Sequence, residues 1–186
     1  MYDLIIIGAG PAGLTASIFA SCLGLKNIVM GTILGGQLDV APYILNYPGF
    51  EGVTGKELAI RMMGQVKVRG GELVAQSATR IENSEFRIKN EQGESIEKCF
   101  KVITREGNKF QGRAVILATG TERRKLNVPG EVEYTAKGVH YCATCEELDY
   151  RDKVCGVVGG ANAAIQVAVE VAQVAFHVYI IYRGHN

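Results

Sequence analysis

Two cysteines in the stretch HYCATCEEL, Cys142 and Cys145, are the residues of this chain best suited to chemistry. A pair with this spacing commonly lowers the pKa of one thiol, and it can form and open a disulfide. The same spacing also supplies half of a structural zinc site. Such a site needs further ligands, and His140, His177 and His185 make a poor set because the last two are remote from the pair in sequence. The spacing therefore favours a redox pair, and we expect no bound metal.

The remaining cysteines, Cys22, Cys99 and Cys155, occur in apolar or strand-like surroundings. Free cysteine is among the most frequently buried residue types, so we expect each of them to be a small hydrophobic residue of the core. The total of 5 cysteines is odd, and no secretion signal accompanies them. A structural disulfide framework is therefore not expected.

The composition and the N-terminal sequence limit which partners and which cellular location we expect. The chain has 20 Lys and Arg residues against 19 Asp and Glu residues, and a net charge of +1 offers no argument for a nucleic-acid partner. The most apolar segment, residues 154–182, is interrupted by glycines and polar residues, so we expect no membrane span. The N-terminus shows neither the basic region nor the cleavage site of a signal peptide. We therefore expect a cytoplasmic protein that binds neither nucleic acid nor membrane.

Ordered elements must position the cysteine pair, and the clearest of them begin at the N-terminus. The run DLIIIGAGPAGLTASIFAS predicts a strand, a glycine-rich turn and a helix. Gly8, Gly10 and Gly13 follow the G-x-G-x-x-G order, in which the glycines permit a tight turn, approach of the backbone to a pyrophosphate, and close packing of helix on strand. The N–H groups and dipole at the start of the helix then hold the phosphates. We therefore predict a dinucleotide site at this turn.

A second unit of the same kind begins at Lys153. KVCGVVGGANAAIQVAVEVAQ predicts a strand, a glycine turn and a helix, and HVYIIY predicts the next strand. Between the two units, the turn-forming stretches NS, EQGE and REGN separate the strand-like runs ELVAQ, FRIKN and KVIT. We interpret these runs as a small antiparallel layer, followed by a buried strand in AVILATG, residues 114–120.

The pattern predicts an α/β fold with two Rossmann-like dinucleotide-binding modules of the three-layer ββα type, and with a small antiparallel β insertion in the first. We place the first domain at residues 1–117 and the second at residues 118–186. Two such modules suggest that electrons pass between two cofactors, typically a nicotinamide and a flavin. A cysteine pair is the natural next carrier.

Six motifs give the chain a specific resemblance. They are GAGPAGLTA, GGQL at 35–38, NYPGF at 46–50, ATG at 118–120, VPGE at 128–131 and GVHYCATC at 138–145. Their order resembles that of bacterial-type, low molecular weight thioredoxin reductases, in the FAD- and NAD(P)-dependent pyridine nucleotide-disulfide oxidoreductase family. The resemblance extends from Tyr2 to Arg183. It implies the N-terminal portion of an FAD-binding domain in residues 1–117 and part of an NAD(P)-binding domain with the redox-active pair in residues 118–186.

The resemblance also implies a function. Electrons would pass from NADPH through FAD and a Cys142/Cys145 disulfide to thioredoxin or a similar small disulfide protein. In that family the first cysteine, here Cys142, attacks the partner disulfide, and the second, here Cys145, faces the flavin. Glu146 occupies the place of the family's aspartate and is a candidate general acid or base. The family further suggests a homodimer.

Position by position, the resemblance gives two sets of cofactor-binding residues. The FAD set is Gly8, Gly10, Pro11, Ala12, Gly13, Gly36, Gln37, Leu38, Asn46, Ala118, Thr119 and Gly120. The NADPH set is Gly159, Gly160, Asn162, Ala163 and Arg183. Without the resemblance, GGQL and NYPGF would be interpreted as ordinary loops.

The sequence also departs from the family. Gly31 stands where an acid usually binds the adenosine ribose, and Ala161 replaces the middle glycine of the second turn. Gln166 replaces a helix glutamate, and the basic HRR after the next strand has become Tyr182, Arg183 and Gly184. Arg183 alone can still pair with a 2′-phosphate.

The chain stops at Asn186, whereas the family continues, so we expect both modules to be incomplete and the chain to bind FAD weakly or not at all. Two alternatives stay open. One is a flavin-dependent thioredoxin reductase with an electron donor other than NADPH, and the other is a catalytically silent nucleotide-binding fragment. The flavoprotein reductase of a peroxidase system is a further possible identity.

Overall fold

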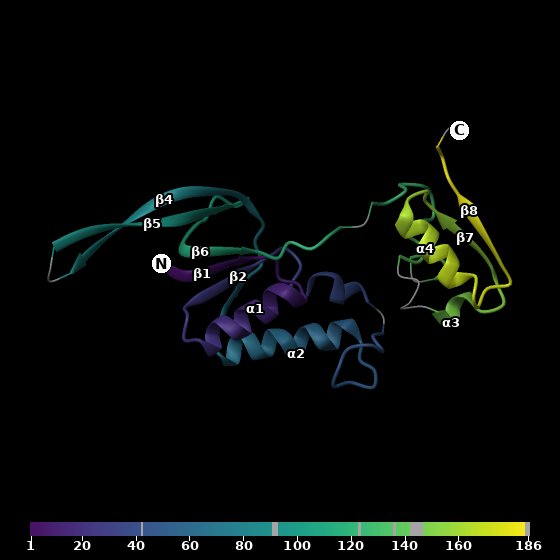
Figure 1. The fold of residues 1–186 in the computed structure, drawn as a ribbon, viewed down its shortest axis with the longest axis horizontal. Coiled ribbons are helices and arrows are strands. Elements are labelled where there is room, and N and C mark those ends of the chain that lie inside the picture. Colours follow the sequence, from purple (N-terminus) through teal and green to yellow (C-terminus); the bar gives the residue numbers. More distant parts are fainter. Residues whose placement is uncertain (42, 91–92, 123, 136, 142–146, 185–186) are drawn as a thin grey trace. The chain divides into compact units, whose positions relative to one another are not determined.

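The computed structural model describes the chain except for residues 42, 91–92, 123, 136, 142–146 and 185–186. It divides into two compact units, Met1–Thr121 and Glu122–Asn186, which Figure 1 draws together. Cys142, Cys145 and Glu146 lie outside the described residues.

The first unit contains a mixed sheet with helices. Its elements are β1 (Tyr2–Ile7), α1 (Pro11–Cys22), β2 (Asn27–Met30), the short 3-10 helix η1 (Gly36–Val40), α2 (Gly55–Val68), β3 (Glu72–Val74), β4 (Ala78–Asn90), β5 (Gly93–Thr104) and β6 (Lys109–Leu117). The strand order is β3-β2-β1-β6-β5-β4. The pairs among β3, β2, β1 and β6 are parallel, whereas β5 pairs antiparallel with both β6 and β4. The predicted α/β fold with an antiparallel insertion in the first module is confirmed.

Two helices cover one face of the parallel strands, where Figure 1 shows α1 and α2 side by side. Leu14 of α1 packs in one cluster with Leu58, Met62 and Val66 of α2. Alternate residues of β1 face this side or the other, as the period of two in a strand requires. Ile6 packs toward α1. The helices therefore hold β1, and with it the turn that follows, in a fixed position.

The antiparallel strands cover the opposite face. Val102 of β5 is fully buried and packs with Ile5, Ile7, Ile28 and Met30. Strand β6 serves both layers, because Gly112 pairs with Tyr2 of β1 and with Phe100 of β5. The result is three layers, with the parallel strands in the middle.

A buried polar cluster fastens α1 to the start of β2. Asn27 is 1% exposed, and its Oδ1 accepts a hydrogen bond of 2.5 Å from the Ser17 hydroxyl. Its amide donates to Ser21 Oγ at 2.8 Å and to the Leu25 carbonyl at 3.0 Å. Buried polar groups need such partners, so this cluster fixes the packing of the helix on the strand.

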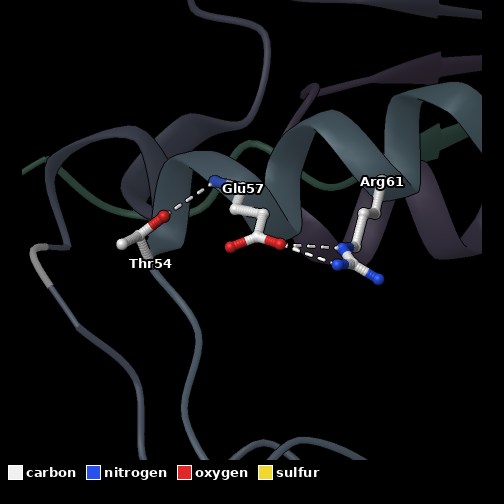
Figure 2. Close-up of polar contacts among 3 residues, drawn as sticks. All are labelled: Thr54, Glu57 and Arg61. Atoms are coloured by element: carbon white, nitrogen blue, oxygen red, sulfur yellow. Dashed lines mark hydrogen bonds and ion pairs between the residues drawn. The ribbon is translucent and has the colours of Figure 1, made fainter.

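Thr54 caps α2 at its N-terminus. Its Oγ1 accepts a hydrogen bond of 3.2 Å from the Glu57 N–H, as Figure 2 shows. The Glu57 carboxylate turns along the helix and pairs with Arg61, with a shortest distance of 2.7 Å. Both side chains of that pair are about half exposed, so the pair contributes little, whereas the cap satisfies a backbone donor.

Three predictions about the region between the modules need correction. Glu72–Val74 pairs parallel with β2 and is not part of the antiparallel layer. The expected NS turn lies inside β4, where Ser84 is paired with Cys99 of β5, because ladder hydrogen bonds override the turn preference of two polar residues. The strand in AVILATG is present as the end of β6, but Leu117 is 66% exposed. The REGN turn is confirmed, since Thr104 N–H donates to the Asn108 carbonyl.

The second unit contains α3 (Glu147–Tyr150), β7 (Val154–Val158), α4 (Asn162–Val171) and β8 (His177–Ile181). Strands β7 and β8 are parallel, so the predicted strand, turn, helix and strand are confirmed. Within the helix, the Gln166 amide donates to the Glu170 carboxylate at 3.1 Å.

Two further results concern burial. Cys99 is buried as expected and Cys155 is half-buried, but Cys22, at the last turn of α1, is exposed, so that prediction was wrong. A helix end projects toward solvent where the chain leaves the packed face, and the sequence pattern does not reveal this. Among the described residues, no helix has the length and hydrophobicity needed to cross a membrane.

Candidate functional site

The first unit places a candidate dinucleotide site where the direction of strand addition reverses. The chain adds β2 and then β3 on one side of β1, and later adds β6 on its other side. In open α/β sheets, ligands bind at such a switch point, beyond the carboxyl ends of the strands. The turn after β1 and the ATG segment after β6 both lie at this edge.

Gly8 lies at the end of β1 in a conformation that disfavours other residues, with φ of +118°. Its N–H donates to the Met30 carbonyl at 2.8 Å, and the Ala118 N–H donates to the Ile7 carbonyl at 2.7 Å. A Cβ on Gly8 would lie 2.0 Å from the Ala118 carbonyl oxygen. The turn and the ATG segment therefore touch through their backbones.

Gly13 lies in the first turn of α1, directly against the strand. A Cβ there would lie 1.8 Å from the Gly8 carbonyl oxygen and 3.3 Å from a methyl group of Ile6. The helix can approach β1 this closely only because residue 13 has no side chain. The positive φ of Gly8 thus fits the tight turn expected at the first glycine, and Gly13 fits the close packing of helix on strand expected at the third.

Gly10 differs from Gly8 and Gly13 because no backbone lies close to the place of its missing Cβ. It is the N-cap of α1 with φ of −82°, and the nearest atom to a Cβ built on it would be the Gly36 Cα at 3.9 Å. The fold therefore leaves room for a methyl group at residue 10, which is half-buried. No described side chain caps the helix, and Pro11 follows at its first position. A free helix N-terminus beside an open space favours an anionic group.

The GGQL segment meets the same turn. Gly35 N–H donates to the Ala9 carbonyl at 2.8 Å, and a Cβ on Gly36 would lie 2.9 Å from the Gly10 Cα. The Gln37 amide donates to the Thr121 carbonyl at 3.2 Å, just beyond the ATG segment. We define residues 8–13, 35–38 and 118–121 as the glycine cradle.

The other residues predicted to bind FAD lie partly at the start of α1, partly at the surface and partly in the core. Pro11 and Ala12 begin α1, and Thr119 and Gly120 are exposed after β6. Leu38 is 9% exposed and packs in the core, so its side chain anchors η1. Asn46 is exposed in the loop between Ile44 and Val53 and takes no part in the contacts of the cradle.

Gly31, where the family usually has an acid, also touches the turn. A Cβ on Gly31 would lie 2.9 Å from the Ala9 backbone nitrogen. An acidic side chain at this position would therefore require a shift of the turn or of the Gly31 backbone.

The second glycine turn follows β7. Gly159 has φ of +144°, and a Cβ on it would lie 2.8 Å from the Ala164 Cβ. Ala161 is the N-cap of α4, so Asn162 and Ala163 are its first residues, and both are exposed. A Cβ on Gly160 would lie 2.0 Å from the ring of Tyr182. That tyrosine, which replaces a basic residue of the family, thus packs against the turn.

One group that the sequence did not single out is the carboxylate of Glu131. It is 4% exposed; its Oε1 accepts a hydrogen bond of 2.8 Å from Leu126 N–H and one of 2.5 Å from the Tyr141 hydroxyl, and its Oε2 accepts one of 2.7 Å from Asn127 N–H. The Tyr141 hydroxyl and these backbone donors hold the pKa of Glu131 below its usual value. The same hydrogen bond raises the pKa of Tyr141. The signal in the sequence was the Pro-Gly turn of VPGE, whose glutamate follows directly.

Comparison with known proteins identifies the family. Residues 2–186 match the family model described as pyridine nucleotide-disulphide oxidoreductase. The chain belongs to this family. This match confirms the family resemblance drawn from the motifs. A separate result concerns metals: in the described part of the chain, no group of His, Cys, Asp and Glu residues could hold a metal ion.

The similar proteins include several thioredoxin reductases. The chain is 35% identical to that of Bacillus subtilis over 184 residues, which make up 98% of this chain and 54% of the relative. Identity to that of Ureaplasma parvum is 35%, over 97% of this chain and 55% of the relative. The chain thus spans about half the length of the curated relatives it matches.

Two solved structures with a fold similar to that of this chain are also thioredoxin reductases. Thioredoxin reductase from Streptococcus pyogenes is 35% identical, with a TM-score of 0.82 over 100% of this chain and 57% of that chain. Thioredoxin reductase from Giardia duodenalis is 30% identical, with a TM-score of 0.81 over 99% of this chain and 58% of that chain.

Proposed function

We propose that the chain is part of an FAD-dependent disulfide oxidoreductase of the thioredoxin reductase type. The observation that carries the proposal is Gly10, which the fold does not need as a glycine but which a bound diphosphate would. It lies in the glycine cradle at the N-terminus of α1, at the switch point of the sheet. The relatives named thioredoxin reductase support the same assignment.

The residues of the cradle fit FAD. The backbone at Gly8, Gly10, Pro11, Ala12 and Gly13 would hold the diphosphate, because the helix end is open and unoccupied by any described side chain. Gly36, Gln37, Leu38, Ala118, Thr119 and Gly120 would line the remainder, and Asn46 would contribute from its loop. When bound, FAD supplies two-electron transfer between a nicotinamide and a disulfide.

The cysteines complete the reaction. The Cys142 thiolate would attack a disulfide of thioredoxin or a similar small protein, and Cys145 would displace the product from the mixed disulfide. Glu146 would exchange the proton of a thiol. In total, NADPH, one proton and one disulfide become NADP⁺ and two thiols. Thioredoxin as the partner, a homodimer and a cytoplasmic setting are parts of this proposal.

NADPH would bind at the second glycine turn, with its phosphates near Gly159, Gly160, Asn162 and Ala163 and its 2′-phosphate paired with Arg183. One observation favours a different electron donor. The Tyr182 ring packs against Gly160, where a nucleotide would approach the backbone, and Ala161 adds a methyl group beside it. In the proposed domain assignment, residues 1–117 belong to the FAD-binding part and residues 118–186 to the NAD(P)-binding part.

The disulfide chemistry is testable on this chain without a flavin. The oxidised chain is mixed with reduced thioredoxin, the thiols are blocked with an alkylating agent under denaturing conditions, and the peptides are analysed by mass spectrometry. We expect a Cys142–Cys145 disulfide that exchanges with thioredoxin, and no exchange in the Cys142→Ser variant. If both cysteines stay alkylatable after mild oxidation while a zinc assay is positive, the redox assignment is wrong.

A further inference from the structure

Tyr182 directly follows the last strand of the second unit, beside the second glycine turn. We propose that this tyrosine limits nucleotide binding at the turn, because its ring lies on the backbone that a diphosphate would approach. The inference rests on the proposed nucleotide site in residues 118–186. It names the residue that decides how readily this site accepts a nicotinamide nucleotide.

The two parallel strands bring the tyrosine and the turn to the same edge. Val158 at the end of β7 pairs with Ile181 at the end of β8, and the Gly159 N–H donates to the Ile181 carbonyl at 3.0 Å. Tyr182 is therefore the first residue beyond β8, as Gly159 is the first beyond β7. Ligands of open α/β sheets bind beyond these carboxyl ends of the strands, so the ring lies where a nucleotide is expected.

Two glycines leave the space that the ring occupies. A Cβ built on Gly160 would overlap Cδ2 and Cε2, on one edge of the Tyr182 ring. A Cβ built on Gly184 would overlap Cε1, Cζ and the hydroxyl oxygen, on the other edge and at the tip. A side chain at either position would displace the ring, so its present position depends on both glycines.

The turn under the ring is otherwise suited to a phosphate group. Helix α4 begins directly after the turn, with Ala161 as its N-cap, and no described side chain caps this helix end. Asn162, the first residue of the helix, is exposed, and the first turn contains no acidic residue. The N–H groups and the dipole at a helix start favour an anion. The feature that opposes a nucleotide here is therefore the ring and not an unfavourable charge.

The contact of the ring with the turn can be broken, because Tyr182 is 65% exposed and only part of it packs against the glycines. A nucleotide that must displace the ring binds with an apparent dissociation constant raised by the reciprocal of the fraction of chains whose turn is open. Removing or expelling the ring should therefore strengthen binding. A tyrosine that stacked on the bound nucleotide would have the opposite effect, since its loss would weaken binding.

The test titrates NADP⁺ into the whole chain and follows the amide signal of Gly160 by heteronuclear NMR, which separates binding at this turn from binding at the glycine cradle. Tyr182→Ala removes the ring. Gly184→Ala keeps the tyrosine but places a methyl group where the ring lies. The matched control is Tyr179→Ala, which removes an exposed tyrosine from β8 itself. Circular dichroism verifies that each variant is folded.

We expect both test variants to bind NADP⁺ at least about fivefold more tightly than the wild type, and Tyr179→Ala to stay within about 1.5-fold of it. If one test variant does not fold, the other decides. Unchanged or weaker binding in a folded test variant overturns the blocking role of Tyr182 and leaves the proposed nucleotide site standing. If the Gly160 signal responds to NADP⁺ in no variant and not in the wild type, both the blocking role and the nucleotide site at this turn are wrong.

Discussion

Gly10 and Gly13 lie in one turn, yet the structure gives them different reasons to be glycine. A side chain at residue 13 would collide with the backbone of Gly8, whereas one at residue 10 would meet nothing closer than 3.9 Å. Gly13 is therefore required for the close packing of α1 on β1, whereas the fold does not require a glycine at residue 10, where we propose that a bound diphosphate does. Variants at the two positions separate stability from binding.

We expect Gly13→Ala to destabilise the first unit by about 3 kcal/mol, because a Cβ would lie 1.8 Å from the Gly8 oxygen. Gly64→Ala is the matched control, since Gly64 lies inside α2 with no atom within 4 Å of a built Cβ. That change should stabilise the chain by about 0.5–1 kcal/mol, as alanine is the better helix former. Urea unfolding followed by circular dichroism measures both. Equal effects of the two substitutions would show that the close approach of α1 to β1 is wrong.

Glu131 should make the second unit sensitive to acid. Its pKa is lowered in the folded protein, so its contribution to stability is present above the ordinary value of 4.5 and is lost as the pH falls through the lowered value. The free energy of unfolding should fall more steeply below pH 4.5 in the wild type than in Glu131→Gln. Urea titrations at neutral and acidic pH test this, with Glu133→Gln as a control that should follow the wild type. Parallel pH profiles for Glu131→Gln and the wild type would contradict the buried carboxylate.

At the scale of elements, a single substitution tests whether the N-terminal cap stabilises α2. Thr54→Ala removes the acceptor for the Glu57 N–H and should cost about 1 kcal/mol, because the helix end loses a hydrogen bond. Thr54→Ser keeps the hydroxyl and should cost markedly less. Thermal unfolding of the two variants gives the comparison, and identical losses would mean that the cap does not stabilise α2.

Elements with a strong local signal were predictable from the sequence. The spacing of Gly8, Gly10 and Gly13 was enough to predict β1, the turn and α1. The second glycine turn predicted β7 and α4 in the same way. Local signals failed where tertiary pairing decides. Ser84 reads as a turn former but lies in a long ladder, and Glu72–Val74 joins the parallel sheet through contacts with β2 that are distant in sequence.

The candidate site was only partly predictable, because local sequence signals do not reveal contacts between distant segments. Spacing identifies the glycines, but it does not reveal that Gly36 packs on Gly10 or that Gln37 reaches Thr121, since these contacts join segments far apart in the chain. The Glu131 carboxylate was missed because a glutamate after a Pro-Gly turn is usually solvated. Only the folded chain brings Tyr141 to it.

At the scale of the whole chain, the two units carry separate parts of the proposed reaction. The first contains the glycine cradle, and the second contains the second nucleotide turn and the segments that flank the cysteines. Membership of the pyridine nucleotide-disulphide oxidoreductase family applies to residues 2–186, across both units. The central claim is that the cradle binds the diphosphate of FAD.

The most direct measurement of that claim is the affinity for FAD of the wild-type chain and of Gly10→Ala, from the change in flavin fluorescence on titration. We expect weak binding to the wild type, with a dissociation constant above about 1 µM, because most of the proposed affinity comes from backbone groups that hold the diphosphate. ADP should compete and riboflavin should not. Gly10→Ala should lose at least about tenfold in affinity, while its urea stability stays within about 0.5 kcal/mol of the wild type, since the added methyl group has room in the fold. Unchanged affinity in the folded Gly10→Ala variant, or displacement of FAD by riboflavin and not by ADP, would contradict the account.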